Sequence, residues 1–161
     1  GNVDGQLHSW NLVRVDGEYY YMDPTWGDAG YVRPGNVPAN LQSGESVNYE
    51  YFLITTEQLT KSHVIDNTIP LPACVATRNN YYIREGLYFT TYDEAALNVL
   101  FERAESNGES CVTFMCSDAV VYQQMKEQLI TEQKVFSYVK WSASVSYSYN
   151  DELYTLIFWI E

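Results

Sequence analysis

The clearest pattern in the chain is an alternation of apolar and polar residues near its N-terminal end. Residues 9–15 alternate, a run rich in β-forming residues follows over 18–23, and Asp16-Gly17 between them is typical of a two-residue hairpin turn. If Asp16 and Gly17 form the loop, Val15 faces Glu18. The pattern therefore predicts two antiparallel strands with one fixed register.

That register brings two chemically active side chains together. Counting outward pairs Trp10 with Asp23 and His8 with Thr25, and it predicts a shared face made of His8, Trp10, Tyr21, Asp23 and Thr25. His8 and Asp23 become diagonal neighbours about 7–8 Å apart at the backbone, which their side chains can bridge. The spacing suits a carboxylate that fixes the tautomer of a general-base histidine. The structural alternative is a histidine packed beside Trp10, with Asp23 capping the turn at Pro24.

The second half of the chain predicts alternating strands and helices. Two helices are expected, one capped by Asp93 and ended by Asn107-Gly108, the other opened by Asp118 and ended near Thr131. Strands are expected at 80–90, 110–116, 135–141, 143–149 and 153–160. The order β-α-β-α-β-β-β indicates a small α+β sandwich with both helices on one face of the sheet. Within it, Val145, Tyr147 and Tyr149 share one face of a strand, which is expected to be the core face; the alternative is an exposed tyrosine row that stacks on sugar or peptide.

The region between these halves suggests a boundary. Residues 29–46 are rich in Gly, Pro, Asn and Ser and predict a long loop; 47–54 predicts a strand, and 56–59 a turn or helix start. A chain of 161 residues with 46% hydrophobic content can form one large or two small domains. We expect a division at about residue 75, giving parts 1–75 and 76–161.

The hairpin residues resemble a known family. HSWNLVRVDGEYYYMDPTWGD is similar to the bacterial transglutaminase-like family, in which a His-x-Trp-Asn strand, an Asp-Gly turn and an Asp-Pro-Thr-Trp strand end follow one another. A weaker likeness continues in Tyr51-Phe52-Leu53-Ile54 and Lys61-Ser62-His63, which look like the "YFL … H" segment of bacterial members. The resemblance implies that 1–75 is the C-terminal β-sheet portion of a papain-like transglutaminase core, followed by an accessory domain over 76–161.

The resemblance also implies roles for individual residues. His8 would be the catalytic base and Asp23 its orienting carboxylate in a Cys-His-Asp site, and Trp10 would shield the site from water or contact substrate. In the family the nucleophilic cysteine precedes the histidine by some tens of residues, whereas seven residues precede His8 here and none is a cysteine. We therefore expect this chain to be a fragment of a longer enzyme and to be inactive alone.

The three cysteines of the chain are poor substitutes for that nucleophile. Cys74 lies in an extended proline-containing segment, and Cys116 precedes a helix cap but comes after His8, an order opposite to that of the family. Cys111 and Cys116 are an odd number of residues apart, so on one strand they face opposite sides and cannot readily form a disulfide. All three are best interpreted as small, mostly buried residues.

Charge and composition narrow the partners. The net charge of −12 repels phosphate backbones, so nucleic acid is not expected, and no run is long enough to span a membrane. Two histidines, with His63 beside Ser62 and Asp66, do not make the spacing of a structural metal site, so neither metal nor cofactor is expected. The expected partners are a protein or peptide substrate and the missing N-terminal part of the same protein. The family resemblance places the protein outside a bacterial cell or at its surface.

Two functions remain open at this stage. In the first, the intact parent protein hydrolyses protein amides or transfers their acyl group to an amine, with residues 76–161 presenting substrate or tethering the enzyme. In the second, the fold is kept as a scaffold that binds peptide or glycan without catalysis. An upstream cysteine would distinguish the two.

Overall fold

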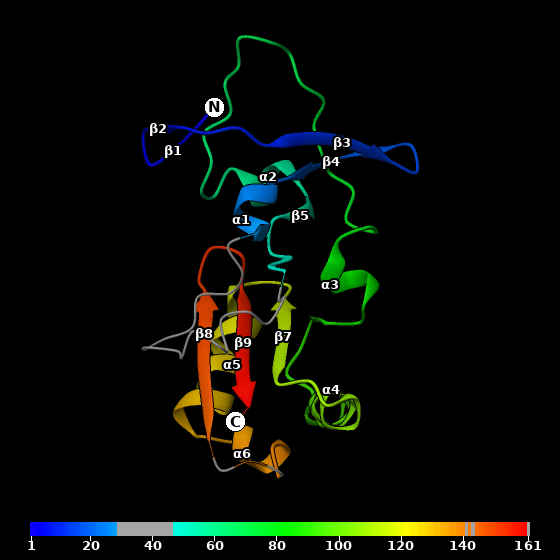
Figure 1. Cartoon of the computed structure of the whole chain (residues 1–161), viewed down its shortest axis with the longest axis vertical. Coiled ribbons are helices and arrows are strands. Elements are labelled where there is room, and N and C mark those ends of the chain that lie inside the picture. The colour runs from blue at the N-terminus through cyan, green and yellow to red at the C-terminus, as the bar shows by residue number, and fades with distance from the viewer. Residues whose placement is uncertain (29–46, 141, 143, 161) are drawn as a thin grey trace. The chain divides into compact units, whose positions relative to one another are not determined.

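The computed structural model describes residues 1–28, 47–140, 142 and 144–160. Over these residues the protein has a mixed α+β fold, as expected (Figure 1). The predicted loop over 29–46 lies outside the described residues. The described chain forms two compact units, 1–28 with 47–86, and 87–160. Each unit is described by itself.

The first unit consists of short strands and helical turns. Its strands form a two-stranded sheet, β1-β2, and a three-stranded antiparallel sheet in the order β3-β4-β5. Its elements are β1 (Asn2–Val3), β2 (Gln6–Leu7), β3 (Asn11–Val15), β4 (Glu18–Met22), α1 (Pro24–Asp28), β5 (Phe52–Ile54), α2 (Thr56–Leu59) and α3 (Tyr81–Arg84).

The β3–β4 hairpin has the predicted register. Val15 pairs with Glu18 and Asn11 with Met22, and Asp16-Gly17 form the turn between the strands. Both turn residues have left-handed backbone angles, with φ of 50° at Asp16 and 85° at Gly17. This is the conformation for which an Asp-Gly pair is favoured in a tight hairpin.

A β-branched residue at the turn should weaken the hairpin. We expect Gly17→Val to lower the free energy of unfolding of the first unit by about 1–2 kcal/mol, because a Cβ is unfavourable at positive φ. A Cβ at this position meets no atom within 4 Å, so the cost is conformational and not a clash. Urea unfolding measures it, with Gly17→Asn as the control because asparagine tolerates this conformation. Equal stability of the two variants would contradict the argument.

The hairpin ends earlier than the sequence indicates. Thr25 was expected on a strand opposite His8, but α1 begins at Pro24, so this pairing is wrong. The change of structure occurs because Asp23 caps the new helical turn with its side chain. The strand expected over 47–54 is likewise confined to β5, which pairs with β4 through a register shift between Tyr21 and Met22.

Residues 76–86 belong to the first compact unit in the structure. The side chain of Arg78 donates to the Asp16 carbonyl, and Asn79 Nδ2 donates to Asp16 Oδ2 at 3.2 Å and to the Tyr20 hydroxyl at 3.3 Å. These contacts tie the segment to the hairpin turn. The strand predicted over 80–90 is present only as β6 (Tyr88–Phe89). Its first part is wrong, because Asn80 caps α3 by accepting a hydrogen bond from the backbone N–H of Tyr82.

The second unit contains a four-stranded mixed sheet in the order β6-β7-β9-β8. β6 runs parallel to β7, and the other pairs are antiparallel. Its elements are β6 (Tyr88–Phe89), α4 (Glu94–Asn107), β7 (Cys111–Cys116), α5 (Ala119–Lys126), the π-helix η1 (Glu127–Thr131), α6 (Val135–Tyr138), β8 (Val145–Asn150) and β9 (Thr155–Ile160).

Helix ends in this unit follow the predicted caps. Asp93 accepts from the backbone N–H of Ala96, and Asp118 accepts from those of Val120 and Val121. Gly108 ends α4 in the left-handed conformation that C-cap glycine favours. The helix predicted from Asp118 to near Thr131 is present as α5 continued by η1.

Two expectations for the last third of the chain are wrong. The strand predicted over 135–141 is α6 over its first four residues, and Trp141 lies outside the described residues. Tyr147 and Tyr149 were expected in the core, but they are 41% and 45% exposed and stack on each other. They lie on β8, an edge strand, where the ammonium of Lys126 is 3.8 Å from the centre of the Tyr149 ring.

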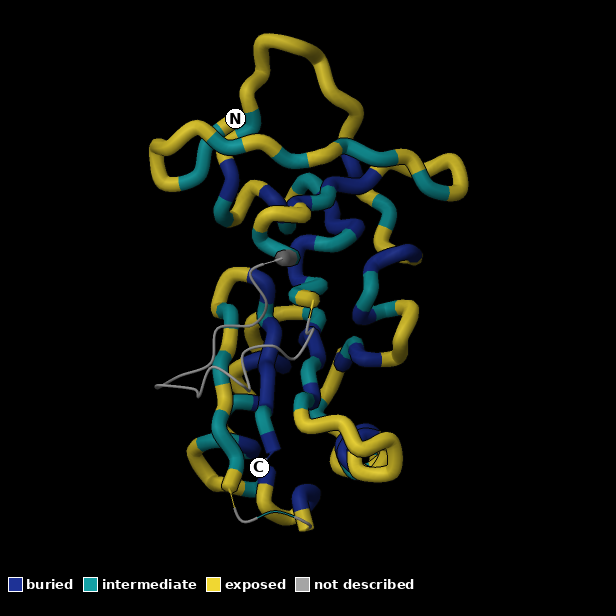
Figure 2. Tube along the Cα trace, viewed as in Figure 1, coloured by how far each residue is buried: buried dark blue, intermediate teal, exposed yellow. Residues whose placement is uncertain are grey.

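Each unit has its own buried interior (Figure 2). In the second unit the centre is β9, whose residues are buried on both faces except for the partly exposed Trp159. In the first unit Tyr20, Ile54 and Leu59 are fully buried. Among the described residues, no helix has the length and apolar character required to cross a membrane.

Candidate active site

Asp23 is the centre of a buried polar cluster in the first unit. It follows β4, and its backbone N–H donates to the carbonyl of Tyr51 at 3.0 Å. Its Oδ1 accepts hydrogen bonds from the backbone N–H groups of Thr25 at 3.0 Å and Trp26 at 3.2 Å, which caps α1. The residue is 1% exposed. One carboxylate oxygen is thus committed to the backbone, and the other is left for side chains.

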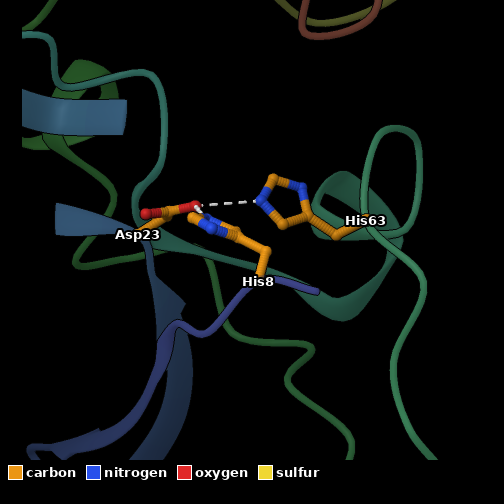
Figure 3. Close-up of side chains that lie close together, drawn as sticks. All are labelled: His8, Asp23 and His63. Atoms are coloured by element: carbon orange, nitrogen blue, oxygen red, sulfur yellow. Dashed lines mark hydrogen bonds and ion pairs between the residues drawn. The ribbon is translucent and has the colours of Figure 1, made fainter. Parts of the chain in front are cut away.

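His8 is hydrogen-bonded to that second oxygen. Its Nε2 lies 2.6 Å from Asp23 Oδ2, so the predicted contact between these two side chains is present (Figure 3). The backbone of His8 is held by a hydrogen bond from its N–H to the carbonyl of Gly1 at 3.1 Å. The His8 side chain keeps 19% of its surface exposed, so the buried carboxylate is linked to solvent through this ring.

A second histidine binds the same oxygen. His63 Nε2 lies 3.0 Å from Asp23 Oδ2, and Figure 3 shows the two imidazoles converging on it from separate segments. The backbone N–H of His63 donates to the Leu59 carbonyl, and Val64 pairs with Asn2 through two backbone hydrogen bonds. Because Asn2 and Gly1 lie on the segment that leads into His8, the same ladder places both histidines beside Asp23.

Aromatic rings surround His63. Its ring centre lies 5.0 Å from that of Trp10, 4.7 Å from that of Trp26 and 5.2 Å from that of Tyr51. Trp26 also packs edge-on against Tyr51 at 4.6 Å. Trp10, predicted as a residue that shields the site or contacts substrate, therefore lies in the cluster and packs on His63. These rings exclude water from the inner half of the site, which strengthens the hydrogen bonds there.

The environment of Asp23 favours its charged form. Burial alone would raise the pKa of the Asp23 carboxyl, but hydrogen bonds from His63, His8 and the backbone N–H of Trp26 outweigh it, and the net pKa lies below the ordinary value. The carboxylate therefore acts as an acceptor on both oxygens at neutral pH.

This lowered pKa predicts how stability depends on pH. A carboxyl whose pKa is lower in the folded state stabilises the fold above its unfolded pKa of about 4, and that contribution is lost as the pH falls from there through the folded value. We expect the gap in unfolding free energy between the wild-type chain and Asp23→Asn to narrow below about pH 4. Urea unfolding at several pH values measures the gap. A gap that is constant from pH 7 to pH 2.5 would contradict this assignment.

Three atoms of this cluster are of the kind that bind metal ions: His8 Nε2, Asp23 Oδ2 and His63 Nε2 all lie within 4.8 Å of one another. However, the ligands of tetrahedral zinc are about 3.3 Å apart for bonds of about 2.0–2.1 Å. The two Nε2–Oδ2 distances, 2.6 and 3.0 Å, are shorter and match hydrogen bonds. The geometry is therefore that of a hydrogen-bonded cluster. Asp66, the other carboxylate near His63 in the sequence, is exposed and accepts from the backbone of Thr68 instead.

The three cysteines of the chain, all among the described residues, form no disulfide bond with one another. Burial raises the pKa of the Cys74 thiol, although the Thr56 hydroxyl opposes this effect. Burial and the Asp118 carboxylate raise the pKa of Cys116 to about 12. Both residues are therefore thiols at neutral pH, whereas nucleophilic cysteines are thiolates. Cys111 lies with Cys116 on β7 of the second unit.

Reasoning from the hairpin found only part of this cluster. It placed His8, Asp23 and Trp10 together, but it missed His63 as a partner of the carboxylate, because His63 is 40 residues from Asp23. The rings of Trp26 and Tyr51 were also missed. Tyr51 and His63 were part of the weaker "YFL … H" likeness, but that likeness did not predict that either residue lies beside Asp23.

No protein-family model matches the chain, and no curated protein matches it.

Proposed function

We propose that this chain supplies the acid–base half of a transglutaminase-like cysteine enzyme, with His8 as the general base and Asp23 as the carboxylate that orients it. The observation that carries the proposal is the 2.6 Å contact between His8 Nε2 and the buried, ionised Asp23. In this proposal the first unit is the C-terminal β-sheet portion of a papain-like core.

The proton arrangement supports a base. An ionised carboxylate only accepts, so His8 donates from Nε2, and in the neutral ring Nδ1 then carries the lone pair. Among the described residues no hydrogen bond is formed by His8 Nδ1, and the ring is partly exposed. A lone pair on the partly exposed ring, with the opposite nitrogen held by a carboxylate, is the arrangement that a Cys-His-Asp enzyme needs.

The nucleophile in this proposal is a cysteine from a part of a longer protein outside this chain. Cys74 and Cys116 are buried thiols whose raised pKa values disfavour the thiolate. Ser62 also lies in the cluster, but its hydroxyl is shared between the Tyr51 hydroxyl and His63 Nδ1, so it serves as a bridge. The proposal therefore requires an external thiol that reaches His8 Nδ1.

The reaction has two half-steps. The thiol transfers its proton to His8 Nδ1 and attacks the amide carbon, the proton then passes to the leaving nitrogen, and cleavage of the C–N bond leaves a thioester. In the second step water or an amine attacks the thioester while His8 takes its proton. The C–S bond breaks, and the proton returns to sulfur. Asp23 keeps His8 in the correct tautomer and stabilises the imidazolium in both steps.

The test is an amide hydrolysis and acyl-transfer assay on the longer protein. Ammonia release, peptide-bond cleavage and incorporation of a fluorescent primary amine are measured with glutamine-containing peptides, in the wild type and in a variant lacking the mapped cysteine. We expect at least one of these signals, and we expect it to require the cysteine. A protein that gives none of the three signals would contradict the proposal and favour the non-catalytic scaffold that binds peptide or glycan.

A further inference from the structure

Four hydrogen bonds link five side chains into one network. The Tyr51 hydroxyl lies 2.9 Å from Ser62 Oγ, and Ser62 Oγ lies 2.7 Å from His63 Nδ1. His63 Nε2 lies 3.0 Å from Asp23 Oδ2, which lies 2.6 Å from His8 Nε2. This hydrogen-bond network therefore extends from the buried Tyr51 to the partly exposed His8.

With His63 neutral, only one placement of protons satisfies every member of this network. The carboxylate accepts from both rings, so His63 donates from Nε2 and its Nδ1 is an acceptor. Ser62 must then give its single proton to His63, and it accepts one from Tyr51. If His63 carried its proton on Nδ1 instead, its Nε2 would face Asp23 Oδ2 as a second acceptor in a buried site, which is costly.

Three of the five side chains in this network are buried, and Ser62, between Tyr51 and His63, is partly exposed. Tyr51 is 3% exposed, and the side chains of His63 and Asp23 are wholly buried. The rings of Trp10 and Trp26 pack on His63. Polar groups in such a place are tolerated only when they are hydrogen-bonded, and a satisfied network fixes one arrangement of its members.

We infer that His63 is a positioning residue: held by Ser62 and Tyr51, it keeps the Asp23 carboxylate directed at His8 and thereby fixes His8 with its proton on Nε2. The inference rests on the proposed function for the use made of His8, but the proton arrangement belongs to this chain alone. His63 is wholly buried and influences the base through the carboxylate. It acts through Asp23 Oδ2, the same oxygen that contacts His8.

The first test needs no mutation. The chain contains two histidines, and both lie in this cluster, so histidine labelled with ¹⁵N gives a spectrum of only these two rings. Correlations between ring protons and nitrogens identify the tautomer of each ring at neutral pH. We expect His8 and His63 both to carry the proton on Nε2. A proton on Nδ1 of His63 would overturn the inference.

The second test compares two substitutions of His63. Leucine removes the donor to Asp23, whereas the side-chain amide of glutamine can reach the position of Nε2 and keep an N–H there. In His63→Leu we expect the titration of the Asp23 carboxyl, followed by its ¹³C resonance, to shift to higher pH, and the His8 Nε2 proton to exchange faster with water. His63→Gln should resemble the wild type. An unchanged Asp23 titration in His63→Leu would overturn the inference.

A further pair covers the case in which His63→Leu does not fold. Ser62→Ala removes the donor to His63 Nδ1 and leaves the histidine in place, while Ser62→Thr keeps the hydroxyl. The alanine variant should shift the Asp23 titration in the same direction, and the threonine variant should not. Identical titrations of Asp23 in the two variants would overturn the inference that Ser62 holds His63 in place. These readouts need no thiol, so they can succeed or fail independently of the proposed enzyme activity.

Discussion

Replacing Asp23 by alanine should lower the free energy of unfolding of the first unit by about 3–5 kcal/mol, because it leaves several part-buried or buried donors unpaired and each such donor costs about 1–3 kcal/mol. Asp23 accepts from two imidazoles through Oδ2 and from the N–H groups of Thr25 and Trp26 through Oδ1. The alanine variant leaves all four donors without that acceptor. Urea unfolding followed by the resonances of His8 and His63 reports on this unit specifically.

Asp23→Asn is the matched control for that loss. An asparagine oxygen can still cap α1 through Thr25 and Trp26, but its amide nitrogen cannot accept from the histidines. We therefore expect a smaller loss than in Asp23→Ala at neutral pH. An alanine variant within about 1 kcal/mol of the wild type would contradict the role of Asp23 as the centre of the cluster, since a single neutral hydrogen bond contributes that much.

Replacing His8 by alanine should affect catalysis strongly and stability little, whereas replacing Asp23 affects stability strongly. We expect the turnover of the longer protein to fall by about 10²–10⁴-fold, the usual contribution of a general base. The first unit should lose little stability, because the His8 ring is partly exposed and Asp23 keeps its bonds to His63 and α1. Amide hydrolysis and urea unfolding, measured on the same preparations, separate the two effects.

Leu7→Ala provides the comparison for His8→Ala. Leu7 precedes His8 and is 96% exposed, so its truncation changes the same segment without touching the cluster. Turnover should stay at the wild-type level in Leu7→Ala. Equal activities in the two variants would mean that His8 is not the base.

The part of the site that the sequence predicts is the part that depends on local geometry. Asp16-Gly17 fixes the turn, and the turn fixes the pairing from Val15 with Glu18 to Asn11 with Met22. His8 and Asp23 lie just beyond the end of this pairing. Strand periodicity and turn chemistry are enough for this step. What they do not reveal is where a strand stops, and so Thr25 was placed on a strand although Asp23 caps a helix there.

The wrong strand assignments have a similar origin. Residues 81–84 and 135–138 are rich in aromatic and β-branched side chains, which favour strands, yet they form the single helical turns α3 and α6. For α3 the deciding contacts are the cap from Asn80 and the link from Asn79 to Tyr20, a residue 59 positions away. Propensity is a weak guide where such contacts decide. His63 was missed for the same reason, because its contact with Asp23 joins distant segments.

The most direct test of the central claim is the reactivity of the cysteine in the longer protein. Iodoacetamide labelling at mildly acidic pH, with the labelled peptide mapped, is compared between the wild type and His8→Ala. We expect fast labelling of one cysteine outside this chain and a large loss of labelling rate in His8→Ala, because a thiolate–imidazolium pair requires the base. A cysteine that labels as slowly as an ordinary thiol and is indifferent to His8 would contradict the account.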